Sequence, residues 1–172
     1  MRAIEAITDI EAEPQRVWDV LTDFPAYPEW TAYIQELAGD PRPGTTVKVV
    51  LGPPGRKPYV VHAPVLEATP GVRLAWAAVI PGAAWLPHAI YTGVHEFVLA
   101  PLPGGATRLT HREHFSGLLA RLTKEGPAGG DEGFAAFNRA LKRRVEAVRT
   151  HPAPGSDPRQ ATRGEQRRGD QP

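Results

Sequence analysis

Short apolar runs rich in β-branched residues, each bounded by proline and glycine, dominate the middle of the chain. Five of them span residues 45–51, 59–66, 72–80, 91–99 and 107–115, and a weaker run spans residues 33–37. Proline lacks the N–H that a strand ladder needs, and glycine readily adopts the conformations of tight turns. The breaks between the runs contain such residues, for example Gly52-Pro53-Pro54-Gly55 and Pro103-Gly104-Gly105. The pattern therefore predicts a series of antiparallel strands joined by turns.

A long amphipathic helix is predicted after these runs. Its apolar side chains recur at spacings of three and four residues, at Phe134, Phe137, Leu141, Val145 and Val148. A second helix is predicted from Pro14, and residues 24–30 read as a short aromatic helix or turn. Residues 2–12 fit a strand or a helix. Helices on either side of a run of strands indicate an α+β fold whose sheet has one covered face.

Composition excludes several classes of function. The 172-residue chain has no cysteine, which excludes disulfides, thiolate nucleophiles and cysteine-ligated metal sites. Its net charge of +1 argues against nucleic-acid binding. It has neither a membrane span nor the apolar core of a signal peptide, so we predict a cytoplasmic protein. Residues 151–172 lack large apolar side chains and predict a disordered tail, which leaves a folded domain over residues 1–150.

Four motifs carry a resemblance to a known family. They are VWDVLTDF followed by YPEW at residues 17–30, GVHEF at 93–97, TRLTHREHFSGLL at 107–119 and FNRALKRRVE at 137–146. Together they resemble the START-like (SRPBCC) superfamily over residues 3–150. The resemblance implies a helix-grip fold, in which a curved seven-stranded antiparallel sheet wraps around the C-terminal helix and two short helices follow strand 1. It also makes residues 3–11 the first strand. The family contains polyketide cyclases, lipid carriers and chaperone activators, so it does not imply a single function.

The runs 91–99 and 107–115 are expected to form a hairpin that carries the polar candidates. The strand period of two places His111 and Glu113 on the more apolar face of the second strand, and the family pattern places His95 inward on the first. A turn near Pro103-Gly104 would set His95 opposite Glu113, whereas a loop two residues different would set it opposite His111. His95 and Glu113 are the candidate general acid and base. The alternative is that the two merely satisfy each other as a buried polar pair.

A metal centre is not expected in the run His111-Arg112-Glu113-His114. In a strand its two histidines would face opposite sides of the sheet, unlike the histidines of a helical zinc motif. We expect neither a metal nor another cofactor.

Aromatic residues are expected to line a cavity between the sheet and the long helix. Together with His111, the predicted ligand-binding residues are Trp76, Trp85, Tyr91, Phe97, Phe115, Phe134 and Phe137. Residues 81–91 form a long apolar connection where a polar turn would be usual. Two interpretations of this segment stay open, a lid over the cavity and an oligomer contact, as in a homodimer.

Three functions are consistent with these features, and the sequence leaves open whether the protein is an enzyme. The first is binding of a small hydrophobic molecule, aromatic or polyketide-like, in the cavity. The second is a polyketide cyclase, aromatase or dehydratase that uses His95 or Glu113 as general acid or base. The third is a protein-interaction domain of the chaperone-activator type.

Overall fold

The computed structural model describes residues 2–52, 57–78, 92–116 and 130–147. Its elements, in chain order, are β1 (Arg2–Ile10), α1 (Pro14–Thr22), the 3-10 turn η1 (Phe24–Ala26), α2 (Tyr27–Trp30), β2 (Ile34–Ala38), β3 (Thr46–Leu51), β4 (Tyr59–Thr69), β5 (Arg73–Ala78), β6 (Thr92–Leu102), β7 (Ala106–Ser116) and α3 (Gly130–Ala147). The predicted strands and helices are confirmed to within a few residues. Residues 79–91 and 148–172, with Trp85, Tyr91, Val148 and the predicted tail, lie outside the described residues.

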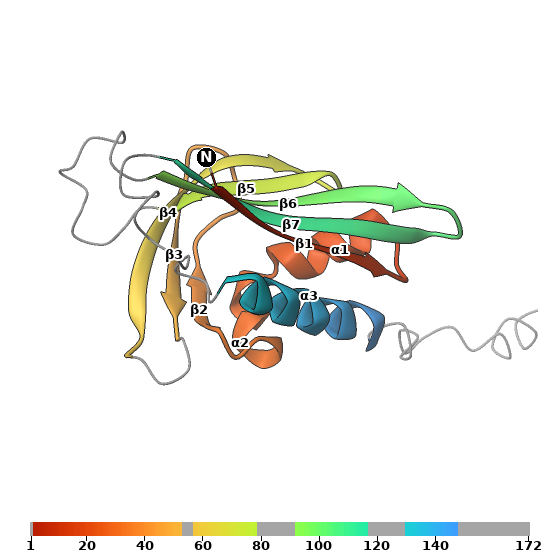
Figure 1. The fold of residues 1–172 in the computed structure, drawn as a ribbon, viewed down its shortest axis with the longest axis horizontal. Coiled ribbons are helices and arrows are strands. Elements are labelled where there is room, and N and C mark those ends of the chain that lie inside the picture. The colour runs from red at the N-terminus through yellow and green to blue at the C-terminus, as the bar shows by residue number, and fades with distance from the viewer. Residues whose placement is uncertain (1, 53–56, 79–91, 117–129, 148–172) are drawn as a thin grey trace, which may run out of the picture.

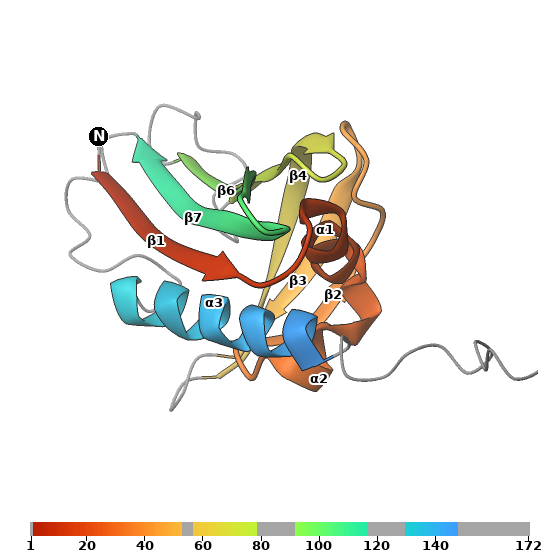
Figure 2. The ribbon, with the colours of Figure 1, turned by 90° about the vertical axis from the view of Figure 1, so that its right-hand side faces the viewer.

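The described strands form one seven-stranded sheet in the order β1-β7-β6-β5-β4-β3-β2, with antiparallel neighbours throughout. Figure 1 shows that the sheet curls, so that β2, β3 and β4 run down past one end of α3. Figure 2 shows β1 and β7 extending along the same helix. This arrangement is the helix-grip fold, with two short helices after the first strand.

Residues 2–10 form strand β1, although their apolar side chains do not all lie on one face. Ile4 and Ile10 are buried, whereas Ile7 is 57% exposed on the opposite face. Because Ile7 breaks the period of two, the sequence alone left residues 2–12 undecided. The pairing of the whole of β1 with β7 shows that tertiary contacts outweigh this local signal.

The curl of the sheet coincides with an irregularity in β4. The register between β4 and β5 shifts between Val65 and Glu67, so one extra residue lies in β4 at this point. An inserted residue bends its strand and increases the local twist. Pro64 lies next to the shift, where the missing N–H of a proline is tolerated.

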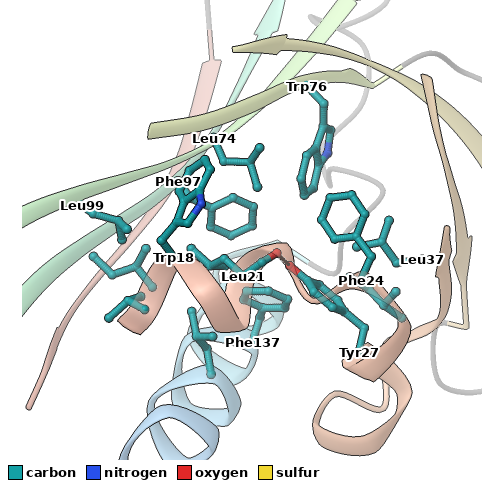
Figure 3. Packing of buried hydrophobic residues seen from close by; sticks show 14 of the residues in the cluster. Trp18, Leu21, Phe24, Tyr27, Leu37, Leu74, Trp76, Phe97, Leu99 and Phe137 are labelled. Carbon is teal, nitrogen blue, oxygen red and sulfur yellow. Dashed lines mark hydrogen bonds between the residues drawn. The ribbon is translucent and has the colours of Figure 1, made fainter. Parts of the chain in front are cut away.

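The core lies between the sheet and the three helices. Figure 3 shows Trp76 and Phe97 projecting from the sheet toward Phe24 and Phe137. The rings of Phe24 and Trp76 meet edge to face with their centroids 6.4 Å apart, and those of Phe97 and Phe137 lie 5.5 Å apart. Aromatic pairs of this kind supply much of the apolar burial of a small domain. Within the described ranges, no helix is long and apolar enough to cross a membrane.

Candidate functional site

The β6–β7 hairpin positions the polar candidates on the concave face of the sheet. Its turn follows Leu102, where Gly104 and Gly105 adopt positive φ angles of 80° and 78° that favour glycine. The resulting register pairs His95 with Glu113 and Phe97 with His111. Of the two registers that the sequence left open, the structure therefore has the first.

His95 nevertheless forms its hydrogen bond with a diagonal neighbour. Its Nε2 lies 2.7 Å from Nε2 of His111, whereas its Nδ1 lies 3.8 Å from the nearer carboxylate oxygen of Glu113. The second distance is too long for a hydrogen bond. His95 and Glu113 are thus directly opposed in the sheet without a hydrogen bond between them. The hydrogen bond instead joins His95 to His111.

His111 is held on the other side by the C-terminal helix. Its Nδ1 lies 2.8 Å from Oδ1 of Asn138 in α3, and the Asn138 amide nitrogen donates to the carbonyl of Ala6 and to Oγ1 of Thr8 in β1. Both His111 and Asn138 are buried. A continuous hydrogen-bond chain therefore runs from His95 through the interior to the edge strand.

Aromatic rings enclose this chain. His95 stacks on Trp76 with an interplanar angle of 9°, and His111 lies between Phe97 and Phe134, with ring centroids 4.4 Å and 4.1 Å away. The side chain of His95 is 17% exposed, whereas that of Glu113 is 4% exposed. Of the three side chains His95, His111 and Asn138, it is therefore His95 that reaches solvent.

The predicted site residues within the described part of the chain come together. Those whose side chains lie around the two histidines are Trp76, Phe97, Glu113, Phe134 and Phe137. Phe115 of β7 pairs with Gly93 of β6, but its side chain is outside the described part. Trp85 and Tyr91 lie outside the described residues. Within the described ranges, no group of three His, Asp or Glu side chains is arranged to hold a metal ion.

Asn138 is the site residue that the sequence interpretation missed. It follows Phe134 by four residues and precedes Leu141 by three, so it belongs to the apolar face of α3. A polar side chain on such a face needs a buried partner. The position of Asn138 on the apolar face of α3 was the signal in the sequence, and His111 is the buried partner that this position required.

Burial dictates the charge state of His111. Desolvation between the rings lowers the pKa of His111 well below its ordinary value of 6.5, and the neighbouring His95 lowers it further, while the hydrogen bond to Asn138 acts in the opposite sense. The folded protein therefore holds this imidazole neutral at a pH where the unfolded chain protonates it.

We expect this difference to make the protein less stable as the pH falls below the ordinary histidine pKa. Below about pH 6.5 the unfolded chain binds the proton first, so stability drops by up to about 1.4 kcal/mol per pH unit until the folded pKa is reached. Urea denaturation between about pH 5 and pH 7.5 measures this slope. His111→Gln should flatten it, and the exposed His62→Gln should not. Equal slopes in wild type and His111→Gln would contradict the assignment.

Comparison with solved structures supports the fold assignment. An aromatase/cyclase from Streptomyces sp. R1128 superposes with a TM-score of 0.64 at 18% identity, covering 90% of this chain and 98% of that one. A START superfamily protein from Mycobacterium smegmatis gives 0.62 at 17% identity, covering 85% and 98%. A norcoclaurine synthase from Thalictrum, solved as a point mutant with a transition-state analogue, gives 0.62 at 14% identity, covering 86% and 96%.

Sequence comparison identifies the family. No protein with curated functional information matches the chain. The family model described as polyketide cyclase/dehydrase and lipid transport matches residues 1–151, which is most of the chain. The chain therefore belongs to the polyketide cyclase/dehydrase and lipid transport family of START-like proteins.

Proposed function

We propose that the protein binds a small, mainly apolar molecule, aromatic or polyketide-like, beside His95 on the concave face of the sheet. The observation that carries the proposal is the partial exposure of His95, which stacks on Trp76 and ends a buried polar chain. Binding sites for such ligands combine apolar walls with a few well-placed polar groups. Membership of a family of cyclases and lipid transport proteins supports the same class of ligand.

The site would combine apolar side chains with one polar group. Trp76 and Phe134 form the apolar surroundings of His95, with ring centroids 5.4 Å and 5.3 Å from its imidazole. The imidazole supplies the polar contact. Because His111 already holds Nε2 of His95, the imidazole ring has a defined orientation before any ligand arrives. Such preorganisation lowers the entropic cost of binding.

Native mass spectrometry of the full chain purified from its own host tests this proposal. We expect a population that carries a bound small molecule, and His95→Phe should reduce the bound fraction at least about fivefold because it removes the polar anchor while keeping an aromatic ring. His62→Phe, at an exposed position of β4, is the matched control and should retain the wild-type bound fraction. Recovery of wild type entirely without ligand, or equal bound fractions in wild type and His95→Phe, would overturn the proposal.

The second candidate is a cyclase, aromatase or dehydratase in the same place. It is favoured by the closeness of three titratable side chains, since His95 has Glu113 3.8 Å from its Nδ1 and His111 2.7 Å from its Nε2. His95 would take a proton from the carbon between two carbonyls, the enolate carbon would add to another carbonyl of the same substrate, and the resulting alkoxide would take the proton back from His95. His95 would then remove the second proton from the same carbon, a C=C bond would form, and the hydroxyl would take that proton and leave as water. Incubation with a synthetic poly-β-ketone distinguishes the functions, because an enzyme returns it lighter by one water and a carrier returns it unchanged.

Other predictions from the sequence remain proposals. The cytoplasmic location is one of them, and the protein-interaction function and the homodimer are two more. The homodimer depends on residues 81–91, which lie outside the described residues, and the protein-interaction function depends on that segment or on the outer face of the sheet.

A further inference from the structure

Asn138 fixes which atoms donate and which accept along the buried hydrogen-bond chain. Its amide nitrogen lies 3.1 Å from the backbone carbonyl oxygen of Ala6, and a carbonyl oxygen can only accept. The NH₂ group must therefore face β1, and the amide oxygen must face His111. This oxygen can only accept, so Nδ1 of His111 carries a hydrogen and donates it across 2.8 Å.

The donor in the next hydrogen bond, between His111 and His95, follows from this. His111 is neutral, since burial between Phe97 and Phe134 lowers its pKa. A neutral imidazole with its hydrogen on Nδ1 has only a lone pair on Nε2. Nε2 of His95 lies 2.7 Å away and must therefore donate. The single hydrogen of a neutral His95 is then committed to His111.

The outer end of the chain is consequently an acceptor. Nδ1 of neutral His95 presents a lone pair toward the Glu113 carboxylate 3.8 Å away. If His95 were an imidazolium that bonded Glu113, the two atoms would approach to about 2.7–2.9 Å, as charge-assisted pairs do. The observed separation instead leaves no hydrogen bond between the two atoms, so the lone pair on Nδ1 of His95 is free to accept from a ligand.

We propose that the site selects ligands that donate a hydrogen bond, namely phenols or enols, over ligands whose polar group can only accept. A hydroxyl placed about 2.8 Å from both atoms would satisfy Nδ1 of His95 or the Glu113 carboxylate, whereas an ether oxygen would face two lone pairs. This inference rests on the proposed function and adds the class of ligand. His111 and Asn138 act in it as positioning residues, because they set which nitrogen of His95 carries the hydrogen.

Two naphthalene probes of nearly equal shape test the selection. Titration calorimetry should show that 2-naphthol binds at least about tenfold more tightly than 2-methoxynaphthalene, since the ether lacks the hydrogen. Asn138→Leu removes the acceptor that orients His111, so the ratio should fall toward one. A loss of stability alone would weaken both probes together and leave the ratio unchanged.

The direction of the chain is measured separately, without a ligand and without a variant. Long-range ¹H–¹⁵N spectra of the imidazoles at neutral pH should show hydrogen on Nδ1 of His111 and on Nε2 of His95. The opposite pattern would overturn the inference. With the expected pattern, equal affinities for the two probes would overturn the donor preference alone, whereas failure of both probes to bind would overturn the proposed function and the preference with it.

Discussion

Replacing Phe97 by alanine is expected to lower the free energy of unfolding by about 3–5 kcal/mol. The ring is 1% exposed and lies among those of Trp76, His111 and Phe137, with centroid separations of 5.5, 4.4 and 5.5 Å. Truncation removes the ring and leaves a cavity, because strand β6 is held on both sides by the sheet and cannot collapse into the space. Urea denaturation at neutral pH measures the loss.

Two further variants keep this prediction falsifiable if the alanine variant does not fold. Phe97→Leu retains part of the apolar volume and should lose less stability than Phe97→Ala. Ile7→Ala, at a 57% exposed position, should change the free energy of unfolding by no more than about 0.5 kcal/mol. A Phe97→Ala variant as stable as Ile7→Ala would show that the ring does not hold the sheet to the helices.

The second large effect is expected at a buried carboxylate on the convex face. Glu96 is 2% exposed, and it accepts hydrogen bonds from Arg73 of β5 and Arg112 of β7, while His114 lies 3.3 Å away. Burial raises the pKa of Glu96, but the hydrogen bonds and charges of the two arginines outweigh this and lower the pKa below its ordinary value of 4.5. The carboxylate thus ties three neighbouring strands together.

Removing both arginines, as Arg73→Met with Arg112→Met, should cost about 2–4 kcal/mol at neutral pH. This range is below that of a fully buried pair because the arginines are about one third exposed. The loss arises because a buried charge is left without a cation, so adding Glu96→Gln should recover much of it. Lys48→Met, which breaks an exposed pair with Glu36, is the matched control and should cost less than about 1 kcal/mol. No recovery on adding Glu96→Gln would contradict this explanation.

The pH dependence of this network has a definite sign. The pKa of Glu96 is lower in the folded than in the unfolded state, so its contribution is present above the ordinary value of 4.5 and disappears as the pH falls through the folded pKa. Glu96→Gln should therefore flatten the acid limb of the stability curve. The Glu96 contribution starts to fall only below about pH 4.5, whereas that of His111 starts to fall below about pH 6.5. Between these values the loss of stability therefore reports His111 and not Glu96.

Much of the fold could be predicted from local patterns. Proline and glycine mark the ends of β3 to β7, and the spacing from Phe134 to Val145 places the inner face of α3. The sequence predicted the β6–β7 hairpin but left two registers open, and the structure has the one that places His95 opposite Glu113. Ile7 shows the limit of this approach, since one outward apolar residue hides the period of a whole strand.

The candidate site could be predicted only in part. The strand period of two places His111 and Glu113 on one face, and the family resemblance adds His95. Neither says which pair bonds, because side-chain length allows both direct and diagonal contact. Glu96 illustrates the same point on the other face. Its outward orientation follows from parity, whereas its burial depends on Arg73 and Arg112 closing over it from neighbouring strands.

The sequence by itself therefore determined most of the elements, the inner faces of β7 and α3, and the absence of thiol chemistry. It could do so because backbone periodicity and turn chemistry act over a few residues. Only the tertiary structure decided that His95 bonds to His111 and that Asn138, 27 residues further along the chain, orients His111. Hydrogen-bond direction in a buried chain depends on every partner, and the last partner, the carbonyl of Ala6, lies at the opposite end of the domain's sequence.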